Sequence, residues 1–92
     1  MIENFRHRGL KRLFEKGEES GFNHEHLEKI NTILGLLNIS SNVQELNLPG
    51  FRLHKLTGNL KGFWSITVRA NWRIIFRFEK GNVLDVDFVD YN

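Results

Sequence analysis

The chain has no cysteine and only one proline among its 92 residues. Without cysteine it can form neither disulfide bonds nor a thiolate metal site, which fits a reducing compartment. Long apolar runs are also missing. The longest stretch without charge, 30–44, contains five Asn or Ser residues, and a membrane-spanning helix needs about 20 apolar residues. Residues 1–6 lack the apolar core of a secretory signal. We therefore predict a soluble, cytoplasmic protein.

Recognisable cofactor motifs are also absent. We find no glycine-rich phosphate loop, no zinc motif and no signature of a Ser or Cys triad, so no cofactor or metal is expected. His24 and His26 are two residues apart and would point in different directions on a helix. Asp85 and Asp87 could form a paired-carboxylate or metal site. Neutralisation of nearby arginines is the stronger interpretation of that pair.

Positive charge is concentrated in residues 51–78. This window holds six basic residues and no acidic one, a charge of +6. The whole chain has a net charge of +2, so the remaining residues carry −4. Six aromatic residues are interleaved with the basic ones. Such a distribution is expected of a surface that meets phosphates. The basic residues are Arg52, Lys55, Lys61, Arg69, Arg73 and Arg77.

The length allows one small domain, 1–92, which would bury about 60–65% of its unfolded surface. Its N-terminal half predicts two helices after a short edge strand at 2–5. Leu10, Leu13 and Phe14 have helical spacing, and Gly17 suits a helix C-terminus. Asn23 can cap a second helix, and 40–50 forms a connection. The apolar stripe of the second helix is Leu27, Ile30, Leu34 and Leu37.

After Gly50 the hydrophobic period changes to two, which predicts strands at 51–56, 63–69, 72–78 and 83–89. Short turns between them imply an antiparallel sheet with one apolar face, which the helices cover. The apolar positions include both tryptophans, which we expect in the core. The fold class is therefore a two-layer α+β domain. The apolar-face positions of the last three strands are Trp64, Ile66, Val68, Trp72, Ile74, Phe76, Phe78, Leu84, Val86 and Phe88.

A three-residue turn at 80–82 would set the register of the last hairpin. It would place Arg77 opposite Asp85, Arg73 opposite Val89, and Asn71 near Tyr91. Arg77 would then be neutralised by Asp85. The polar face of the sheet would gather Arg52, His54, Arg69, Arg73, Arg77 and Tyr91.

His54 is the best candidate for acid–base chemistry, because histidine exchanges protons near neutral pH. The alternative is a surface histidine on a strand. Arg69 and Arg73 can hold a phosphate and offset charge that develops during phosphoryl transfer. At the C-terminus Tyr91 can donate a proton, and Asp90 can accept one or orient a histidine. Strand alternation puts Asp90 with the core residues, so it joins the site only if the strand twists or frays.

These motifs resemble the HigB toxins of bacterial toxin–antitoxin pairs, within the RelE/ParE superfamily. The resemblance covers essentially the whole chain, and its run from Trp64 to Phe76 is specific to that group. It implies a RelE-like fold, with two N-terminal helices on a twisted antiparallel sheet. The segments that carry it are 2–5, 9–10, 13–17, Leu53-His54, 62–69, 71–74 and Asp90-Tyr91.

The resemblance implies a ribosome-dependent, metal-independent endonuclease that cleaves mRNA in the ribosomal A site. The 2′-hydroxyl attacks the adjacent phosphate, the 5′-oxygen leaves, and translation and growth stop. By position, His54, Asp90 and Tyr91 match the family's catalytic residues, while Arg69, Asn71 and Arg73 line its site. We expect Arg73 to stabilise the phosphate. Arg52, Lys55 and Lys61 are expected to bind RNA.

The implied partners are the ribosome, mRNA and a HigA-like antitoxin with a helix-turn-helix domain. Operator DNA would be contacted only indirectly, through that antitoxin. Two positions depart from the family pattern: Thr57 stands where relatives often have lysine, and Asn92 where they often have histidine. Neither residue supplies the charge or proton of its counterpart, and the candidates to replace the missing lysine are Lys55 and Lys61.

Two other functions remain open at this stage. ParE-like members of the superfamily have this fold but inhibit DNA gyrase without cutting RNA, and His54 with its basic surroundings argues against that activity. A plain RNA-binding module is the third hypothesis. Its binding would depend strongly on salt, and His54→Ala would leave its cellular effect unchanged.

Overall fold

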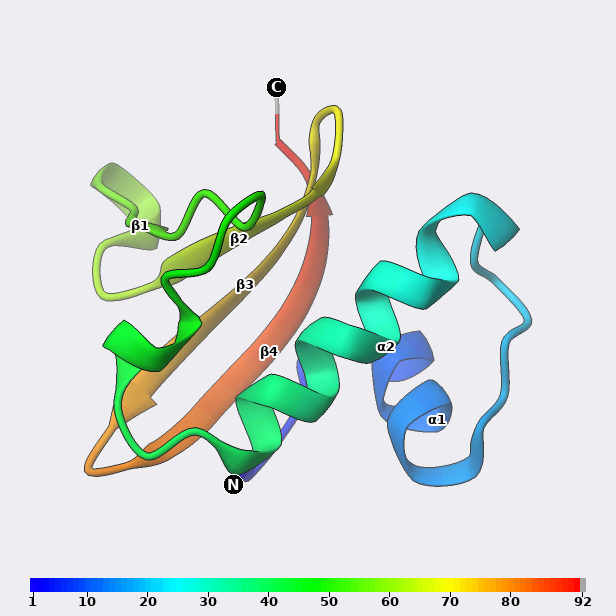
Figure 1. The fold of residues 1–92 in the computed structure, drawn as a ribbon, viewed down its shortest axis with the longest axis horizontal. Helices are drawn as coiled ribbons and strands as arrows, with labels where there is room; N and C mark the ends of the chain where they lie inside the picture. The colour runs from blue at the N-terminus through cyan, green and yellow to red at the C-terminus, as the bar shows by residue number, and fades with distance from the viewer. Residues whose placement is uncertain (92) are drawn as a thin grey trace.

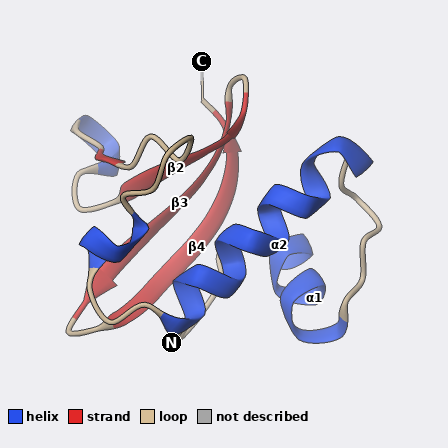
Figure 2. Ribbon diagram, viewed as in Figure 1, coloured by secondary structure: helices blue, strands red, loops and turns tan. Residues whose placement is uncertain are grey.

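Two helices cover one face of an antiparallel sheet in the computed structural model, which describes residues 1–91 (Figure 1, Figure 2). The α+β architecture predicted from the sequence is confirmed. Four strands lie across the sheet in chain order within these residues. No helix in residues 1–91 is both long and apolar enough to cross a membrane. The elements are α1 (Arg8–Lys16), α2 (His24–Ile39), the 3-10 helix η1 (Val43–Leu46), β1 (His54–Lys55), the 3-10 helix η2 (Gly58–Leu60), β2 (Trp64–Arg69), β3 (Trp72–Glu79) and β4 (Asn82–Asp90).

Both helices have the caps that the sequence predicts. Gly17 ends α1 with a φ of 69°, a left-handed conformation that glycine adopts at little cost. The Asn23 side chain accepts a hydrogen bond of 2.9 Å from the N–H of Glu25 at the start of α2. The predicted stripe of α2 is buried in the main core. Phe14 lies in α1 as its spacing predicts, although it is 36% exposed, with its ring centre 5.7 Å from that of Phe5.

The β3–β4 turn is shorter than predicted. Lys80 and Gly81 both have positive φ, 52° and 82°, as a two-residue hairpin turn requires. Glu79 therefore pairs with Asn82, and Arg77 lies opposite Leu84. The prediction that Arg77 lies opposite Asp85 is wrong.

A bulge at Asp85 then shifts the register by one residue. Asp85 has a φ of 54°, and beyond it Ile75 pairs with Asp87 and Arg73 with Val89. The predicted pairing of Arg73 with Val89 is thus confirmed, although by a different route.

The bulge also changes which β4 residues enter the core. Val83 and Val86 are three residues apart, yet both are fully buried. Leu84, predicted to face the core, is only partly buried. The N-terminal segment predicted as an edge strand flanks this irregularity, since Ile2 and Phe5 form isolated parallel bridges to Val83 and Val86.

Asn4 holds the bulge in place from the N-terminal segment. Its side-chain N–H donates to Asp85 Oδ1 at 2.7 Å, and its side-chain oxygen accepts from the Asp85 N–H at 3.1 Å. The hydrogen bond from Asn4 to the carboxylate, together with Arg77, holds the pKa of Asp85 below its ordinary value. Asn4 therefore stabilises both the carboxylate of Asp85 and its left-handed backbone.

The first strand is shorter than the predicted 51–56. Arg52 has a φ of 51°, which interrupts the extended backbone, and β1 contains only His54 and Lys55. The chain after β1 then folds across the sheet face opposite the helices. Leu56, Phe63 and Ile75 form a second, small buried cluster there. We call this the outer face; contrary to prediction, it is partly apolar.

We expect the stability contributed by the Asp85 charge to depend on pH. Because its pKa is lower in the folded chain, the contribution is present above the unfolded pKa of about 3.9 and is lost as pH falls through the folded value. At pH 7, Asp85→Asn should lower the free energy of unfolding by about 1 kcal/mol, a charged hydrogen bond discounted for exposure. Urea denaturation of both proteins should show this gap closing below about pH 4. A gap unchanged at pH 2 would contradict the assignment.

Candidate active site

His54 lies on the exposed edge strand, with one ring nitrogen held by the backbone. Its Nδ1 is 2.9 Å from the carbonyl oxygen of Arg52. Since a carbonyl oxygen only accepts, Nδ1 carries the hydrogen and donates it. The other nitrogen of a neutral ring, Nε2, is then the proton acceptor. The carbonyl of Arg52, whose backbone is left-handed, therefore selects the imidazole tautomer with a free Nε2. A general base needs that tautomer to accept a proton at Nε2.

The sheet places His54 and Arg73 on the same face. His54 pairs with Ser65, Ser65 pairs with Ile75, and in the next row Thr67 pairs with Arg73. Directly opposed residues of an antiparallel sheet point to the same side. His54 and Arg73 are therefore one row and two strand spacings apart on the outer face, with two hydroxyl residues between them; two spacings are about 10 Å.

The guanidinium of Arg73 has one nitrogen that donates a hydrogen bond and another that has no hydrogen-bond partner. Its Nη1 donates to the carbonyl oxygen of Ala70 at 2.6 Å. Its Nε is buried without a hydrogen-bond partner, and so is Oγ1 of Thr67, directly opposite. Two adjacent polar groups without partners are uncommon in a folded interior. Both groups can donate but are buried, so that it is the positive charge of the Arg73 guanidinium that can stabilise an oxyanion on this face.

Ser65 and Thr67 are the residues that the sequence analysis missed. Neither residue was given a role there. Ser65 is 1% exposed, and Thr67 opposes Arg73. The alternation of strand 63–69 could have indicated that these residues lie near Arg73, but only if the register of the next strand had been known.

Arg69 leaves the predicted polar face. The register shifts between Thr67 and Arg69, so that Arg69 lies opposite Trp72, which packs against the main core. Its Nη1 is 2.6 Å from Glu25 Oε2 on α2. Arg69 therefore lies on the helix side of the sheet. The prediction that it shares a face with His54 and Arg73 is wrong, because a bulge reverses the alternation.

The end of β4 and Tyr91 approach the β2–β3 turn (Figure 1). The Tyr91 N–H donates to the Asn71 carbonyl at 2.8 Å, which confirms their predicted proximity. Asp90 pairs with Trp72 and so lies on the helix side, as strand alternation predicted. Tyr91 is 44% exposed. Asn92 lies outside the described residues.

Arg77 follows the alternative interpretation, that of a neutralised charge. Its guanidinium contacts Glu79, and its Nη1 is 3.4 Å from Asp85 Oδ2. Asp87 is engaged separately, with its Oδ1 accepting from the Phe88 N–H and its Oδ2 4.0 Å from Arg6. The two aspartates therefore have different partners, which does not favour a paired-carboxylate site.

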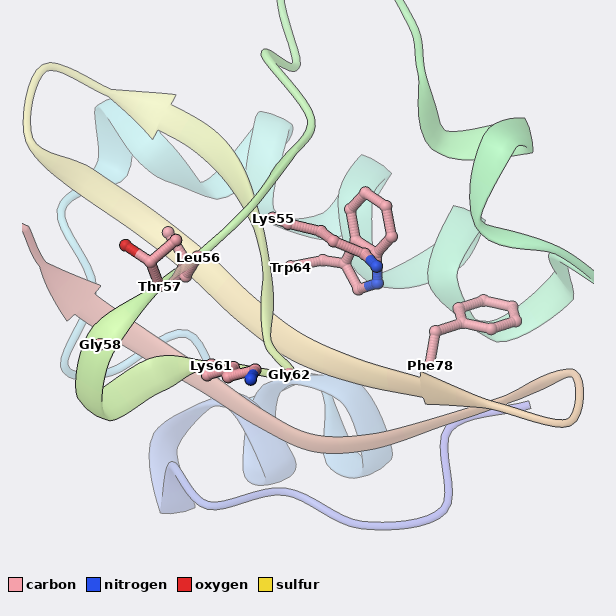
Figure 3. Close-up of a pocket in the computed structure, with 8 residues that line it drawn as sticks. All are labelled: Lys55, Leu56, Thr57, Gly58, Lys61, Gly62, Trp64 and Phe78. Atoms are coloured by element: carbon pink, nitrogen blue, oxygen red, sulfur yellow. The ribbon is translucent and has the colours of Figure 1, made fainter.

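A groove of about 630 Å³ opens beside β1 (Figure 3). Lys55 and Lys61 line it, and both side chains are exposed. Trp64, predicted as core, is only partly buried and also lines this groove. Lys55 Nζ lies over the Trp64 ring at 5.3 Å from its centre. The other residues lining the groove are Leu56, Thr57, Gly58, Gly62 and Phe78.

Solved bacterial proteins share this fold. A YafQ mutant from E. coli superimposes with a TM-score of 0.60 at 18% identity, over 98% of this chain and 91% of its own. The YoeB–YefM complex from Staphylococcus aureus gives a TM-score of 0.58 at 16% identity, over 97% and 95%. At these identities the likeness shows a shared fold and no more.

Sequence comparison identifies the family. The model of the HigB-like toxins, described as the RelE-like toxin of the type II toxin–antitoxin system HigB, matches residues 3–92. Endoribonuclease HigB of Proteus vulgaris is 45% identical over 92 residues, the full length of both chains. The chain belongs to the HigB-like toxin family of type II toxin–antitoxin systems, and the family predicted from its motifs is confirmed.

The unpartnered hydroxyl of Thr67 predicts an unusual effect on stability. Replacing it by the isosteric Thr67→Val removes a buried group that makes no hydrogen bond. We expect the free energy of unfolding to stay the same or to rise by about 1 kcal/mol, because an unsatisfied polar group costs about that much. Urea denaturation at neutral pH measures the difference, with Thr32→Val as a control, since Thr32 donates to Glu28 O at 3.0 Å. Destabilisation of more than about 1 kcal/mol by Thr67→Val would show that the hydroxyl has a partner.

Proposed function

We propose that this chain is a metal-independent endoribonuclease that cuts mRNA in the ribosomal A site and so inhibits translation and growth. The observation that carries the proposal is the placement of His54, with Nδ1 held by the Arg52 carbonyl and on the same face as Arg73. Membership of the HigB-like family and the relation to Endoribonuclease HigB support it.

The reaction divides among few groups. His54 Nε2 takes the proton of the 2′-hydroxyl while the 2′-oxygen attacks the adjacent phosphorus. Negative charge builds on the phosphate oxygens, where the guanidinium charge of Arg73 offsets it. The bond to the 5′-oxygen then breaks, and that oxygen receives a proton. The products are a 2′,3′-cyclic phosphate and a 5′-hydroxyl.

Tyr91 is our candidate for the proton donor. Its backbone is tied to the β2–β3 turn through Asn71, and its side chain is partly exposed. A phenol can donate a proton to the leaving oxygen. Asp90 is the weaker choice, because it pairs with Trp72 on the helix side of the sheet. We assign Asn71 to substrate contact at this turn.

The remaining cations have distinct parts in this proposal. Lys55 and Lys61 contact the RNA backbone along the groove beside β1. Arg52 is exposed and precedes His54 by two residues, so that it can meet a neighbouring phosphate as well as orient the imidazole. Arg69 could contact RNA from the helix side only by giving up Glu25, an exposed pair of little net stability.

As a type II toxin the chain has an antitoxin partner, and we propose a HigA-like protein with a helix-turn-helix domain. Contact with operator DNA would then be indirect, through that protein. The YoeB toxin, which has a similar fold, was solved together with YefM. The ribosome and mRNA complete the proposed assembly, in the cytoplasm. A net charge of +2 is modest for RNA binding, which agrees with a ribosome that positions the substrate.

His54→Ala should reduce mRNA cleavage by about 10²–10⁴-fold, the usual contribution of one acid–base group. Mapping of mRNA 5′ ends after brief expression measures this, and we expect cuts within translated codons that disappear in the mutant. His24→Ala is the matched control, because His24 is exposed on α2 and should leave cleavage unchanged. Intact mRNA with persistent DNA breaks would contradict the proposal in favour of a gyrase inhibitor.

Thr57→Lys should accelerate cleavage. Thr57 is exposed and borders the same groove as Lys55 and Lys61, so that a lysine there adds a positive charge close to His54. Comparison of initial cleavage rates in a purified translating system tests this, with Thr57→Gln as the uncharged control of similar length. An equal gain from both substitutions would show that charge is not the cause, and no gain from lysine would show that Thr57 does not limit the reaction.

A further inference from the structure

The groove beside β1 combines features that the cleavage chemistry does not use. Two exposed lysines, Lys55 and Lys61, border it, and its lining includes the rings of Trp64 and Phe78 (Figure 3). No acidic residue is among the described residues that line it. Its volume of about 630 Å³ falls within the range of small-molecule sites.

The rings of Trp64 and Phe78 remain accessible, although strand alternation places both residues on the core-facing side of the sheet. Trp64 and Phe78 pack against the main core and are only partly buried. The ammonium group of Lys55 lies over the indole ring, 5.3 Å from its centre. Because Lys55 is exposed on an edge strand, its flexible side chain can move from the ring toward a phosphate. The ring surface that it covers is then free for another planar group.

The groove is also close to the proposed scissile phosphate. Lys55 follows His54 directly in β1, and consecutive strand residues point to opposite sides. β1 is a two-residue strand at the edge of the sheet. A chain that passes around this edge therefore meets His54 on one side and Lys55 with Trp64 on the other.

We propose that this groove is a subsite for an unpaired RNA nucleotide that flanks the cleavage position. The base stacks on Trp64, with Phe78 as the second apolar surface, and the adjoining phosphates are contacted by Lys55 and Lys61. Aromatic rings beside a basic, carboxylate-free rim are the features by which proteins hold single-stranded RNA without reading its sequence. The proposal rests on the proposed function, since it names the place of a second nucleotide of the same substrate.

Tryptophan fluorescence tests this without cleavage. The probe is a single-stranded RNA hexamer with 2′-O-methyl groups, which removes the attacking hydroxyl. We expect saturable quenching with a Kd of about 10⁻⁴ M, typical of sequence-independent binding. The quenching should persist in Trp72→Phe and disappear in Trp64→Phe. Absence of Trp64-dependent quenching up to about 1 mM RNA, ten times the expected Kd, would overturn the subsite.

The lysines are tested through the salt dependence of the same titration. Each lysine that contacts a phosphate contributes about 0.7 to the slope of log K against log salt for a single strand. Lys55→Gln and Lys61→Gln should each lower the slope by that amount, while Lys16→Gln on α1 should not. Equal effects of all three substitutions would overturn the specific placement.

A peptide of six glutamates distinguishes RNA from an acidic protein partner. We expect it to quench Trp64 at least tenfold less effectively than the hexamer, because it has no planar bases. Quenching as strong as that by RNA would overturn the nucleotide subsite. If Trp64 is quenched by RNA but the wild-type chain leaves mRNA intact in a translating system, the proposed function fails, and the groove stands as a site for single-stranded RNA with no cleavage position beside it. If mRNA is cut without such quenching, only the subsite fails.

Discussion

The pairing of β3 with both of its neighbours is the constraint on which this domain depends. On the helix side Ile74 and Phe76 are fully buried, and this burial supplies the hydrophobic stabilisation that a 92-residue chain needs. The same alternation places Arg73 and Ile75 on the outer face. The core and the candidate site are therefore two sides of one strand, and its register cannot slip without damaging both.

Two bulges adapt this register to function. The bulge at Asp85 brings both Val83 and Val86 into the core. The shift after Thr67 turns Arg69 toward α2 while Thr67 stays opposite Arg73. What remains on the outer face is a smaller set than a regular sheet would give. Besides Arg77, which is neutralised by Glu79 and Asp85, it includes His54, Arg73 and the hydroxyl residues between them.

Much of the fold could be predicted from the sequence, because helical and strand periodicity report burial directly. The stripe of α2, its Asn23 cap and the strands after Gly62 followed from that pattern alone. The turn length at Lys80-Gly81 and the bulge at Asp85 did not, since left-handed backbone at lysine and aspartate leaves no clear pattern. The pairing of Arg73 with Val89 was predicted correctly because two errors, a long turn and a missing bulge, cancelled.

The candidate site was predictable in its residues but less so in its geometry. His54 and Arg73 stood out by their chemistry, whereas the role of Arg52 depends on a φ of 51°, and that of Thr67 on an unpartnered hydroxyl. Trp64 looked like core because alternation alone cannot show that a residue beside a two-residue edge strand remains partly accessible. Each failure concerns an exposed edge or an irregular backbone, where local pattern and tertiary environment diverge.

The chemistry of the cut ends tests the central claim most directly. Attack by the 2′-hydroxyl leaves a 2′,3′-cyclic phosphate upstream and a 5′-hydroxyl downstream. Polynucleotide kinase should therefore label the downstream mRNA fragments from a translating system without prior phosphatase treatment. Fragments that accept label only after phosphatase treatment would carry 5′-phosphates, which would contradict the account built on His54 and Arg73.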